Sequence, residues 1–477
     1  MTIDIPSMLP SPESVARFVA LFVIGTGLLQ NALSLGQLML AYRVLNRRLV
    51  EPRANALYGR LSDIAMPISL LAPAFNEEAT ICESVRSLLA LHYPNFEVIV
   101  VNDGSKDNTL AVLIDVFGLK PVARAFESVV PHAHIRGIYG SPQMPRLLVV
   151  DKENGGKADA LNAGISVCRK PLFCAIDADS LLESDALLRV VQPFVDDPRR
   201  TIAAGGTIRI ANGCKVRAGR IVSVGLPTRL LPLLQVIEYM RAFLMARLAW
   251  SELNALILIS GAFGIFSRAE AVEVGGYTLG TVGEDLEIIV KLHRLMRDQG
   301  RDYRIQFIPE PVCWTEAPET LAVLGRQRSR WQRGALETFA KHKDMLWSRR
   351  YGRIGLIGMG NVLLVDVLGP LIEVAGYLLI PAFWMLGILD LDYLVAYTAV
   401  TFSFGVTVSV GSLILQELQL KRVTGPAGLL VLLATAIVEN FGYRQLNNLW
   451  RLRGWWQWLR KSESWGTMTR RGFSVTS

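Results

Sequence analysis

Charged residues are scarce in this sequence. Asp, Glu, Lys and Arg make up 19% of its 477 residues, and apolar residues make up 51%. A soluble domain usually carries about 25% charged residues, so the composition argues against a wholly soluble protein. The apolar content also excludes intrinsic disorder. Cysteine is sparse as well: five residues without a Cys-x-x-Cys pair exclude a disulfide scaffold and indicate reduced thiols.

Long stretches of the chain contain no charge at all. Residues 18–42 are uncharged, which predicts an N-terminal transmembrane helix at 14–44. Further uncharged stretches follow at 374–389, 393–416 and 423–438. We therefore expect a C-terminal transmembrane region at 354–447, with about three spans near 354–388, 392–416 and 426–447.

Basic residues lie at the edges of these apolar stretches. Arg43, Arg47 and Arg48 follow the first stretch, and Arg349 and Arg350 precede the next, which predicts that the region between them is cytosolic. Three C-terminal spans would place the C-terminus outside, whereas the basic, aromatic tail at 448–477 favours the inside. Two short crossings or a re-entrant segment would resolve this conflict. The sequence contains no basic stripe of the kind that would indicate nucleic-acid binding.

The middle of the chain has a different pattern. Short β-rich runs at 68–72, 97–102, 146–151, 172–177, 202–208 and 305–309 alternate with amphipathic helical stretches after residues 78, 108, 156 and 184. This alternation predicts an α/β domain with a mostly parallel sheet at 64–319. The apolar stripe within 227–250 predicts a helix at the membrane interface or, alternatively, a core helix. Residues 320–350 predict a second interface helix.

Polar motifs follow several of the predicted strands. Phe75 and Glu77 come after the first, Asp103 ends the second, and Asp177-Ala178-Asp179 follows the fourth. Ligands of parallel sheets bind outside the carboxyl ends of strands. Two carboxylates one residue apart can hold a divalent cation together with a diphosphate. Read alone, each motif is also ordinary turn chemistry.

Three further motifs carry charged or aromatic groups. Lys157 lies near a helix start, where its ammonium could neutralise a diphosphate. Gly283-Glu284-Asp285 opens a helix, so these acids either serve the helix dipole or supply a general base. Gln327, Arg330 and Trp331 share one helix face, which offers an anion contact and a stacking surface for a sugar. A basic interfacial helix is the alternative.

Taken together and in this order, Asn-Asp-Gly-Ser, Asp-Ala-Asp, Gly-Glu-Asp and Gln-x-x-Arg-Trp resemble the membrane-embedded family 2 glycosyltransferases. These are the synthases of cellulose, chitin, hyaluronan and poly-N-acetylglucosamine. The resemblance implies a cytosolic GT-A fold between transmembrane helices of a multi-pass protein of the inner (plasma) membrane. It also implies inverting transfer of a sugar from a nucleotide sugar, expected to be a UDP-sugar, to a β-linked polysaccharide that crosses the membrane.

The resemblance also implies roles for particular residues. Asp285 would be the general base beside Glu284, and Asp177 and Asp179 would hold Mg²⁺ or Mn²⁺. The nucleotide sugar would be bound by Phe75, Glu77, Asp103, Lys157, Asp177, Asp179 and Arg330. The glycan acceptor would be bound by Gly261, Ala262, Phe263, Gln327 and Trp331. Implied partners are the nucleotide sugar, the glycan, the lipid bilayer and accessory export subunits.

Two alternatives to polymer synthesis remain at this stage. The first is transfer of a single sugar to a membrane lipid, since some lipid glycosyltransferases carry a similar Gln/Arg-x-x-Arg-Trp motif. The second is a degenerate receptor or assembly subunit, against which the intact set of Asp177, Asp179, Asp285 and Arg330 argues. Asp366, Glu373 and Glu439, which lie in apolar surroundings, are expected to face a cavity.

Overall fold

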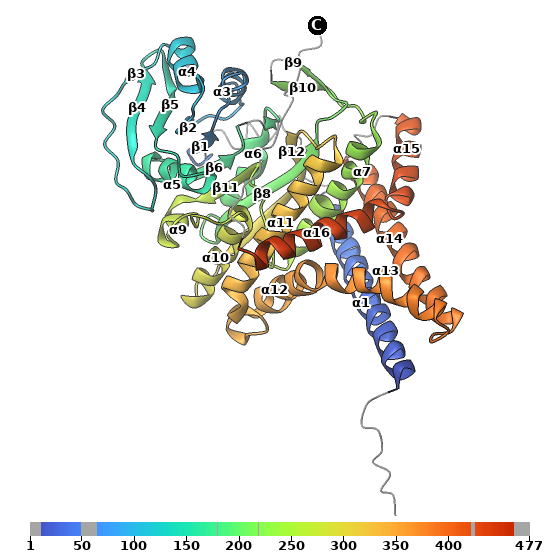
Figure 1. Cartoon of the computed structure of the whole chain (residues 1–477). Helices are drawn as coiled ribbons and strands as arrows, with labels where there is room; N and C mark the ends of the chain where they lie inside the picture. Colours follow the sequence, from blue (N-terminus) through green and yellow to red (C-terminus); the bar gives the residue numbers. More distant parts are fainter. Residues whose placement is uncertain (1–10, 49–63, 179, 218, 421–424, 462–477) are drawn as a thin grey trace, which may run out of the picture.

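A mixed sheet forms the centre of the molecule (Figure 1). The computed structural model describes residues 11–48, 64–178, 180–217, 219–420 and 425–461. The sheet has the strand order β3-β4-β5-β2-β1-β6-β11-β8-β12-β7. Its strands are β1 (Ile68–Ala74), β2 (Phe96–Asp103), β3 (Lys120–Pro121), β4 (Ile135–Ser141), β5 (Met144–Lys152), β6 (Leu172–Ile176), β7 (Leu181–Leu182), β8 (Thr201–Ile210), β11 (Phe263–Ser267) and β12 (Arg304–Thr315). Strands β9 (Lys215–Arg217) and β10 (Arg220–Ser223) form a separate ribbon.

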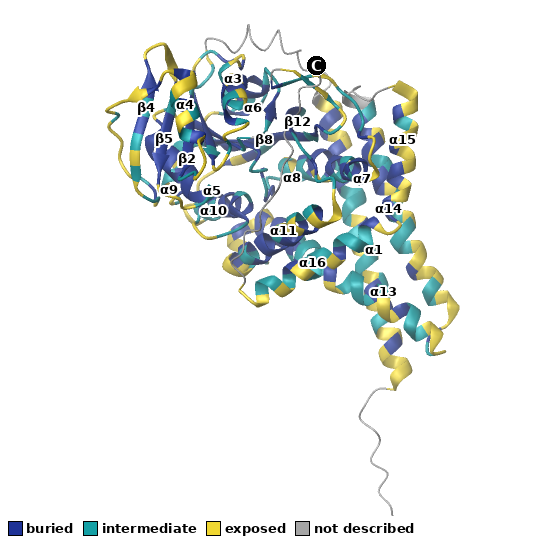
Figure 2. Cartoon of the chain, turned by 45° about the horizontal axis from the view of Figure 1, so that its top comes forward, coloured by how far each residue is buried: buried dark blue, intermediate teal, exposed yellow. Residues whose placement is uncertain are grey.

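All six strands expected from the sequence are present, as β1, β2, β5, β6, β8 and β12. Strands β5, β2, β1 and β6 are parallel neighbours, so their carboxyl ends meet at one edge. Strand β11, which the sequence analysis did not anticipate, lies antiparallel between β6 and β8. Strands β2 and β8 (Figure 2), like β1 and β6, are buried on both faces along almost their whole length, which explains why they read as continuous apolar runs.

Helices cover both faces of the sheet. They are α3 (Ile81–Leu89), α4 (Thr109–Phe117), α5 (Lys157–Val167), α6 (Ala186–Asp196), α9 (Arg268–Glu273) and α10 (Glu284–Asp298). Helix α5 packs on β1 and β2, whereas α6 packs on β8 and β12. Helix α11 (Leu321–His342) follows β12, and the Thr320 hydroxyl accepts from the Val323 backbone N–H at its start.

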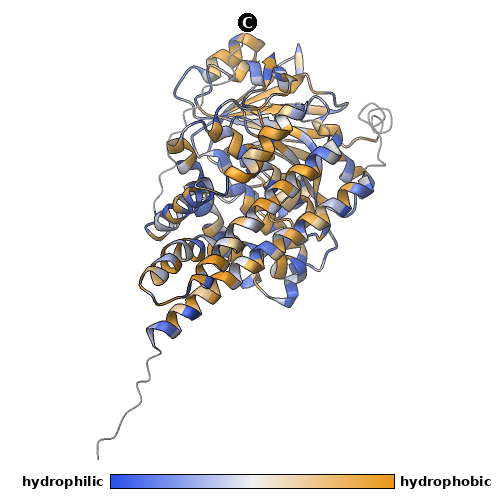
Figure 3. Ribbon diagram, turned by 90° about the vertical axis from the view of Figure 1, so that its right-hand side faces the viewer, coloured by the Kyte–Doolittle hydropathy of each residue, from blue (hydrophilic) through white to orange (hydrophobic). Residues whose placement is uncertain are grey.

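Within the part of the chain that the structure describes, three helices are long and apolar enough to cross a membrane: Pro12–Arg47, Ile354–Met385 and Leu391–Glu417. They correspond to α1 (Pro12–Arg48), to the continuous run through α12 (Met359–Asn361) and α13 (Gly369–Met385), and to α14 (Leu391–Leu420). The run contains the π-helical segments Ile354–Gly358 and Val362–Val367. The helices that extend away from the sheet consist largely of hydrophobic residues (Figure 3).

The last expected span, 426–447, is not one straight helix. Helix α15 (Gly425–Val438) ends early, and α16 (Tyr443–Leu459) continues at an angle of 56°. Fourteen residues of helix rise only about 21 Å, less than the ~30 Å of a hydrocarbon core. The bend lies beside the middle of α14, because Asn440 and Arg444 both approach Gly405. Helix α16 then runs back along α11, where Gly454 approaches the Ser329 carbonyl.

The expected interface helix at 227–250 is built from three pieces. Helix α7 (Leu230–Tyr239) continues as a π-helix (Met240–Arg247) and ends in α8 (Leu248–Glu252). It packs on β8 on one side and on α14 and α15 on the other. Leu233, Ile237 and Met240 form an apolar cluster with Leu413 of α14 and with Leu432 and Ala436 of α15. This segment therefore joins the sheet to the long helices.

Helices α10 and α11 approach so closely that only glycine fits between them. A Cβ atom added to Gly283 would lie 2.8 Å from the Gly334 Cα, and a Cβ on Gly334 would lie 2.8 Å from the Gly283 Cα. This contact fixes the start of α10 against the middle of α11.

We predict that Gly334→Ala lowers the melting temperature of the protein in detergent. The added methyl group must push two backbones apart, which costs about 1–3 kcal/mol, as overpacking does. Gly360→Ala is the control, since a Cβ at that helical position meets nothing within 4 Å. Equal melting temperatures for the two variants would show that the contact is not tight.

Candidate active site

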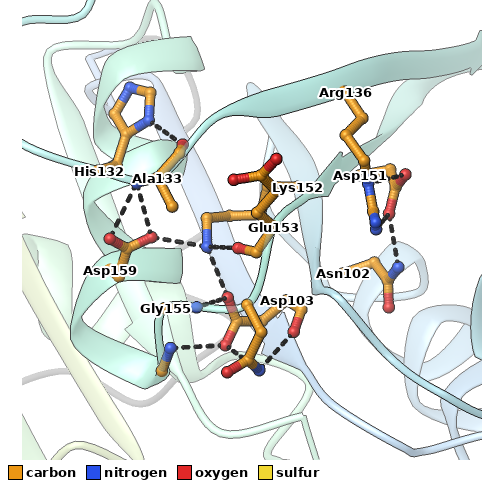
Figure 4. A network of polar contacts seen from close by, with 12 residues as sticks. Asn102, Asp103, His132, Ala133, Arg136, Asp151, Lys152, Glu153, Gly155 and Asp159 are labelled. Atoms are coloured by element: carbon orange, nitrogen blue, oxygen red, sulfur yellow. Dashed lines mark hydrogen bonds and ion pairs between the residues drawn. The ribbon is translucent and has the colours of Figure 1, made fainter.

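Polar groups gather where the parallel strands β5, β2, β1 and β6 end. A buried ion-pair network lies at the end of β2 and β5 (Figure 4). The Lys152 ammonium is fully buried and contacts Asp103 at 2.5 Å and Asp159 at 2.6 Å. Asp159 also accepts from the Ala133 backbone N–H at 2.9 Å. The network therefore ties β2 and β5 to the first turn of α5.

The hydrogen-bond acceptor positions of the Asp103 carboxylate are filled by groups of the protein itself. It accepts from Lys152, from the backbone N–H groups of Gly155 and Gly156 at 3.0 and 2.8 Å, and from the Asn154 side-chain amide at 3.1 Å. A carboxylate offers about four lone-pair positions, and all are filled here. Asp103 thus holds the loop before α5, and its predicted contact with the nucleotide sugar stays a prediction.

A second cluster joins α5, β6 and α10. Lys157, at the start of α5, contacts Asp177 at 2.6 Å and Glu284 at 3.4 Å. Asp177 directly follows β6, and Glu284 is the first residue of α10. Three motifs that are far apart in the sequence therefore meet at one ammonium group.

The pKa values in this cluster depend on burial and on the surrounding carboxylates. Burial alone would lower the pKa of Lys157, but Asp177 and Glu284 outweigh it and raise this pKa, so the ammonium stays charged. Burial raises the pKa of Glu284, and the charge of Asp285 adds to the effect while Lys157 opposes it. Glu284 is therefore less ready to ionise than an exposed glutamate.

Asp285 is oriented by backbone groups. One carboxylate oxygen accepts from the Gly261 N–H at 3.1 Å, and the other accepts from the Leu286 N–H at 2.9 Å. A Cβ atom on Gly261 would lie 2.7 Å from the Lys157 Nζ and 3.6 Å from Asp285. Gly261 therefore lies between the two groups, and a larger residue would displace the lysine.

A cavity of about 850 Å³ opens beside this cluster. At one end it is lined by Lys157, Asp177, Glu284 and Asp285. Its walls include Ser260, Gly261 and Ala262, and the α11 residues Gln327, Arg330 and Trp331. At the other end it is lined by Asp366, Asn447 and Arg451, which belong to the segments after α11. The cavity thus connects the sheet edge with the apolar helices.

Several α11 side chains are fixed by neighbours. Arg328 is buried, contacts Glu238 of α7 at 2.6 Å and lies 4.2 Å from the centroid of the Trp331 ring. Trp331 itself is 44% exposed, so part of its ring is free to meet a ligand. Glu238 also accepts from the Tyr443 hydroxyl at 2.7 Å, which connects α16 to the same wall.

Some predicted residues do not join the cavity. Phe263 is fully buried in the core of the sheet, where it pairs with Ile176, so its side chain does not line the cavity, and its predicted part in acceptor binding stays a prediction. Phe75 and Glu77 follow β1 and remain predictions, since neither lines the cavity. Asp179 lies outside the residues that the structure describes.

The acidic residues of the apolar segments are paired. Asp366 contacts Arg451 at 3.0 Å, Glu373 contacts Arg444 at 3.6 Å, and Glu439 contacts Arg241. Of the three, only Asp366 lines the large cavity; Glu373 borders a much smaller pocket between α1, α13 and α14. Our expectation of acids facing a cavity therefore holds for these two, each with an arginine partner.

Residues that the sequence analysis missed are Lys152, Asp159, Glu238, Arg247 and Arg328. Lys152 and Asp159 flank the Gly155-Gly156 motif, so their positions could have drawn attention. Glu238, Arg247 and Arg328 reach the cavity wall only through the packing of α7 and its π-helical continuation on α11, which leaves no mark in the sequence.

Comparison with known proteins agrees with this geometry. Residues 66–334, more than half of the chain, match the family model described as Glycosyltransferase like family 2. The chain is 30% identical over 275 residues to poly-β-1,6-N-acetyl-D-glucosamine synthases of Staphylococcus aureus and Staphylococcus epidermidis. The alignment covers 57% of this chain and 56% of each relative, so the chain spans about half the length of the curated relatives it matches.

The fold is also found among solved structures. A mannosyltransferase from Pyrobaculum calidifontis, solved with GDP-Man and Mn²⁺, superposes with a TM-score of 0.51 at 17% identity. The match covers 92% of this chain and 99% of that chain. The predicted α/β GT-A-type fold class, with helices capable of spanning a membrane on either side, is confirmed. The chain therefore belongs to glycosyltransferase-like family 2.

Proposed function

We propose that the protein transfers a sugar from a UDP-sugar to a growing β-linked polysaccharide, with inversion at the anomeric carbon. The observation that carries this proposal is the single cavity that joins Asp285 to Lys157 and continues past Trp331 to Asp366. A donor and a chain-like acceptor could therefore share one space. The staphylococcal relatives, named as poly-N-acetylglucosamine synthases, support a polysaccharide product.

The donor would bind at the sheet edge. Asp177, Glu284 and Asp285 place three carboxylates around the one ammonium of Lys157, so the local charge is negative. Hard carboxylate oxygens suit Mg²⁺ or Mn²⁺, and we propose that Asp177 and Asp179 hold this ion. Within the described part of the chain no three such side chains already form a metal site. The bound ion would supply positive charge beside the diphosphate.

Asp285 would act as the general base. Its carboxylate would take the proton of the acceptor hydroxyl while that oxygen bonds to the anomeric carbon and the bond to the diphosphate oxygen breaks. Backbone N–H groups of Gly261 and Leu286 hold the base, so it need not reorient. One displacement, with base and leaving group on opposite sides of the sugar, inverts the anomeric centre.

We predict that Asp285→Asn retains donor binding but lowers transfer about 10²- to 10⁴-fold, the usual value of general-base catalysis. The amide preserves the size of the side chain and removes the basic oxygen, although its NH2 group also replaces one of the two oxygens that accept from the Gly261 and Leu286 N–H groups. Calorimetry with the donor, together with initial rates in detergent, measures both effects. Turnover close to that of the wild type would place the base elsewhere.

We predict a different pattern for two α11 variants. Arg330→Ala removes a charge from the cavity wall and should weaken both donor affinity and rate, because a diphosphate contact exists in the ground and transition states. Trp331→Ala should leave donor affinity intact and shorten the product. Chromatography of the product measures its length. A monoglycosyl lipid as the only wild-type product would contradict polysaccharide synthesis.

The helix arrangement supports passage of the product through a membrane and favours one solution to the conflict over topology. If α1, the 354–385 run and α14 each cross the membrane once, α14 ends on the same side as the cytosolic domain. Helix α15 would enter from that side only to the level of Gly405, and α16 would return to α11. We propose that α15 and α16 form a re-entrant pair and that the C-terminus is cytosolic, beside the catalytic domain.

We predict that a cysteine at Leu459 is labelled by a membrane-impermeant maleimide only from the cytosolic side. The control is Leu386→Cys at the opposite end of α13. The rest of the protein covers neither leucine, since the side chains are 61% and 71% exposed. Labelling of both cysteines from the same side would contradict the re-entrant pair.

A further inference from the structure

The cations that line the large cavity are not equivalent. They are Lys157, Arg229, Arg247, Arg328, Arg330 and Arg451. Four of them have a carboxylate partner: Lys157 has Asp177, Arg229 has Glu319, Arg328 has Glu238, and Arg451 has Asp366. Over the described ranges, no ion pair is found for Arg247 or Arg330. Arg330 belongs to the motif already assigned to the donor, which leaves Arg247 unexplained.

Arg247 is held in place by an aromatic ring and by its helix. It ends the π-helical segment Met240–Arg247, a geometry that is rare and is often found at functional sites. Its guanidinium carbon lies 3.6 Å from the centroid of the Phe243 ring, and both side chains line the cavity. The group is therefore rigid before any ligand binds.

Arg247 also carries an unmet hydrogen-bonding group. Its Nη1 is buried, and the described part of the chain offers it no acceptor. A buried donor without a partner costs about 1–3 kcal/mol, more for a charged group, so such a group needs an explanation. Burial lowers the pKa of Arg247 to about 10, against the effect of Asp285, so the guanidinium is still charged at neutral pH.

The position of Arg247 connects it to the reaction centre. It shares the cavity with Asp285, which contacts Gly261, and Gly261 in turn adjoins Lys157. A guanidinium binds phosphate oxygens through two parallel hydrogen bonds, which an ammonium cannot match. We propose that Arg247 is a second diphosphate-binding arginine, which contacts the leaving group of the nucleotide sugar from the α7 side of the cavity.

This proposal rests on the proposed function, because it assumes a nucleoside diphosphate leaving group. The π-helix would then serve to place Arg247 at the cavity while the preceding helix α7 packs on α14 and α15. The diphosphate would then lie between cations from three different elements, namely α5, α11 and the π-helix.

The test compares the binding of UDP and UMP to the full-length protein in detergent with Mg²⁺. UDP has one more phosphate, so the ratio of the two affinities reports the diphosphate contact. Arg247→Met should weaken UDP binding about 10- to 100-fold and UMP binding much less, the loss expected for a charge-assisted hydrogen bond. Arg247→Lys should give an intermediate ratio. Arg229→Met, which removes a cation paired with Glu319, is the matched control and should leave the ratio unchanged.

The outcomes separate this proposal from the proposed function. If UDP binds the wild type and the ratio is unchanged in both Arg247 variants, the arginine does not contact the diphosphate, although the donor class stands. If the wild type does not bind UDP, the donor assignment is wrong, and inorganic pyrophosphate then serves as the probe. Pyrophosphate binding that is lost in Arg247→Met supports the arginine site, and equal binding overturns it. Should the methionine variant not fold, Arg247→Lys decides alone.

Discussion

The ion pairs of Lys157 are the interaction on which the rest of the site depends. One ammonium draws together the end of β6 and the first residue of α10, which lie more than 100 positions apart in the chain. Without its charge, Asp177 and Glu284 would repel each other, since like charges at close range disfavour joint ionisation. The lysine also restricts the residue beside it: a side chain at position 261 would clash with the Lys157 ammonium, so only glycine fits there.

A single cation cannot balance all of the surrounding carboxylates. The surplus negative charge costs folding free energy, and a bound cation would offset it, as often happens at functional sites where local rules are broken. Two other residues that line the cavity, Arg247 of the π-helix and Arg330 of α11, carry positive charges without a carboxylate partner among the described residues. One ligand with a cation and a diphosphate would satisfy both walls at once, which is why we treat the two imbalances as one feature.

The sequence predicted the parts of the fold that depend on local patterns. Six apolar runs became six strands because a parallel sheet buries both faces, and three of the four uncharged stretches became long helices. The polar motifs at the ends of strands could be predicted because the apolar runs that precede them were recognisable. Strand β11 was missed because it is short and inserted antiparallel. Its first residue, Phe263, is buried in the sheet, whereas Gly261 and Ala262, which line the cavity, precede the strand.

What could not be predicted depends on contacts between distant elements. Where α16 returns to α11, Gly454 lies against Ser329, and the π-helix that carries Arg247 packs against both the sheet and the long apolar helices. Neither leaves a periodic signal. Arg451 illustrates the consequence: in the sequence it is one of several basic tail residues, yet in the structure it pairs with Asp366 at the far end of the cavity. The sequence pattern predicts that this arginine lies at the membrane surface, whereas in the structure it lines the cavity into which the acceptor would extend.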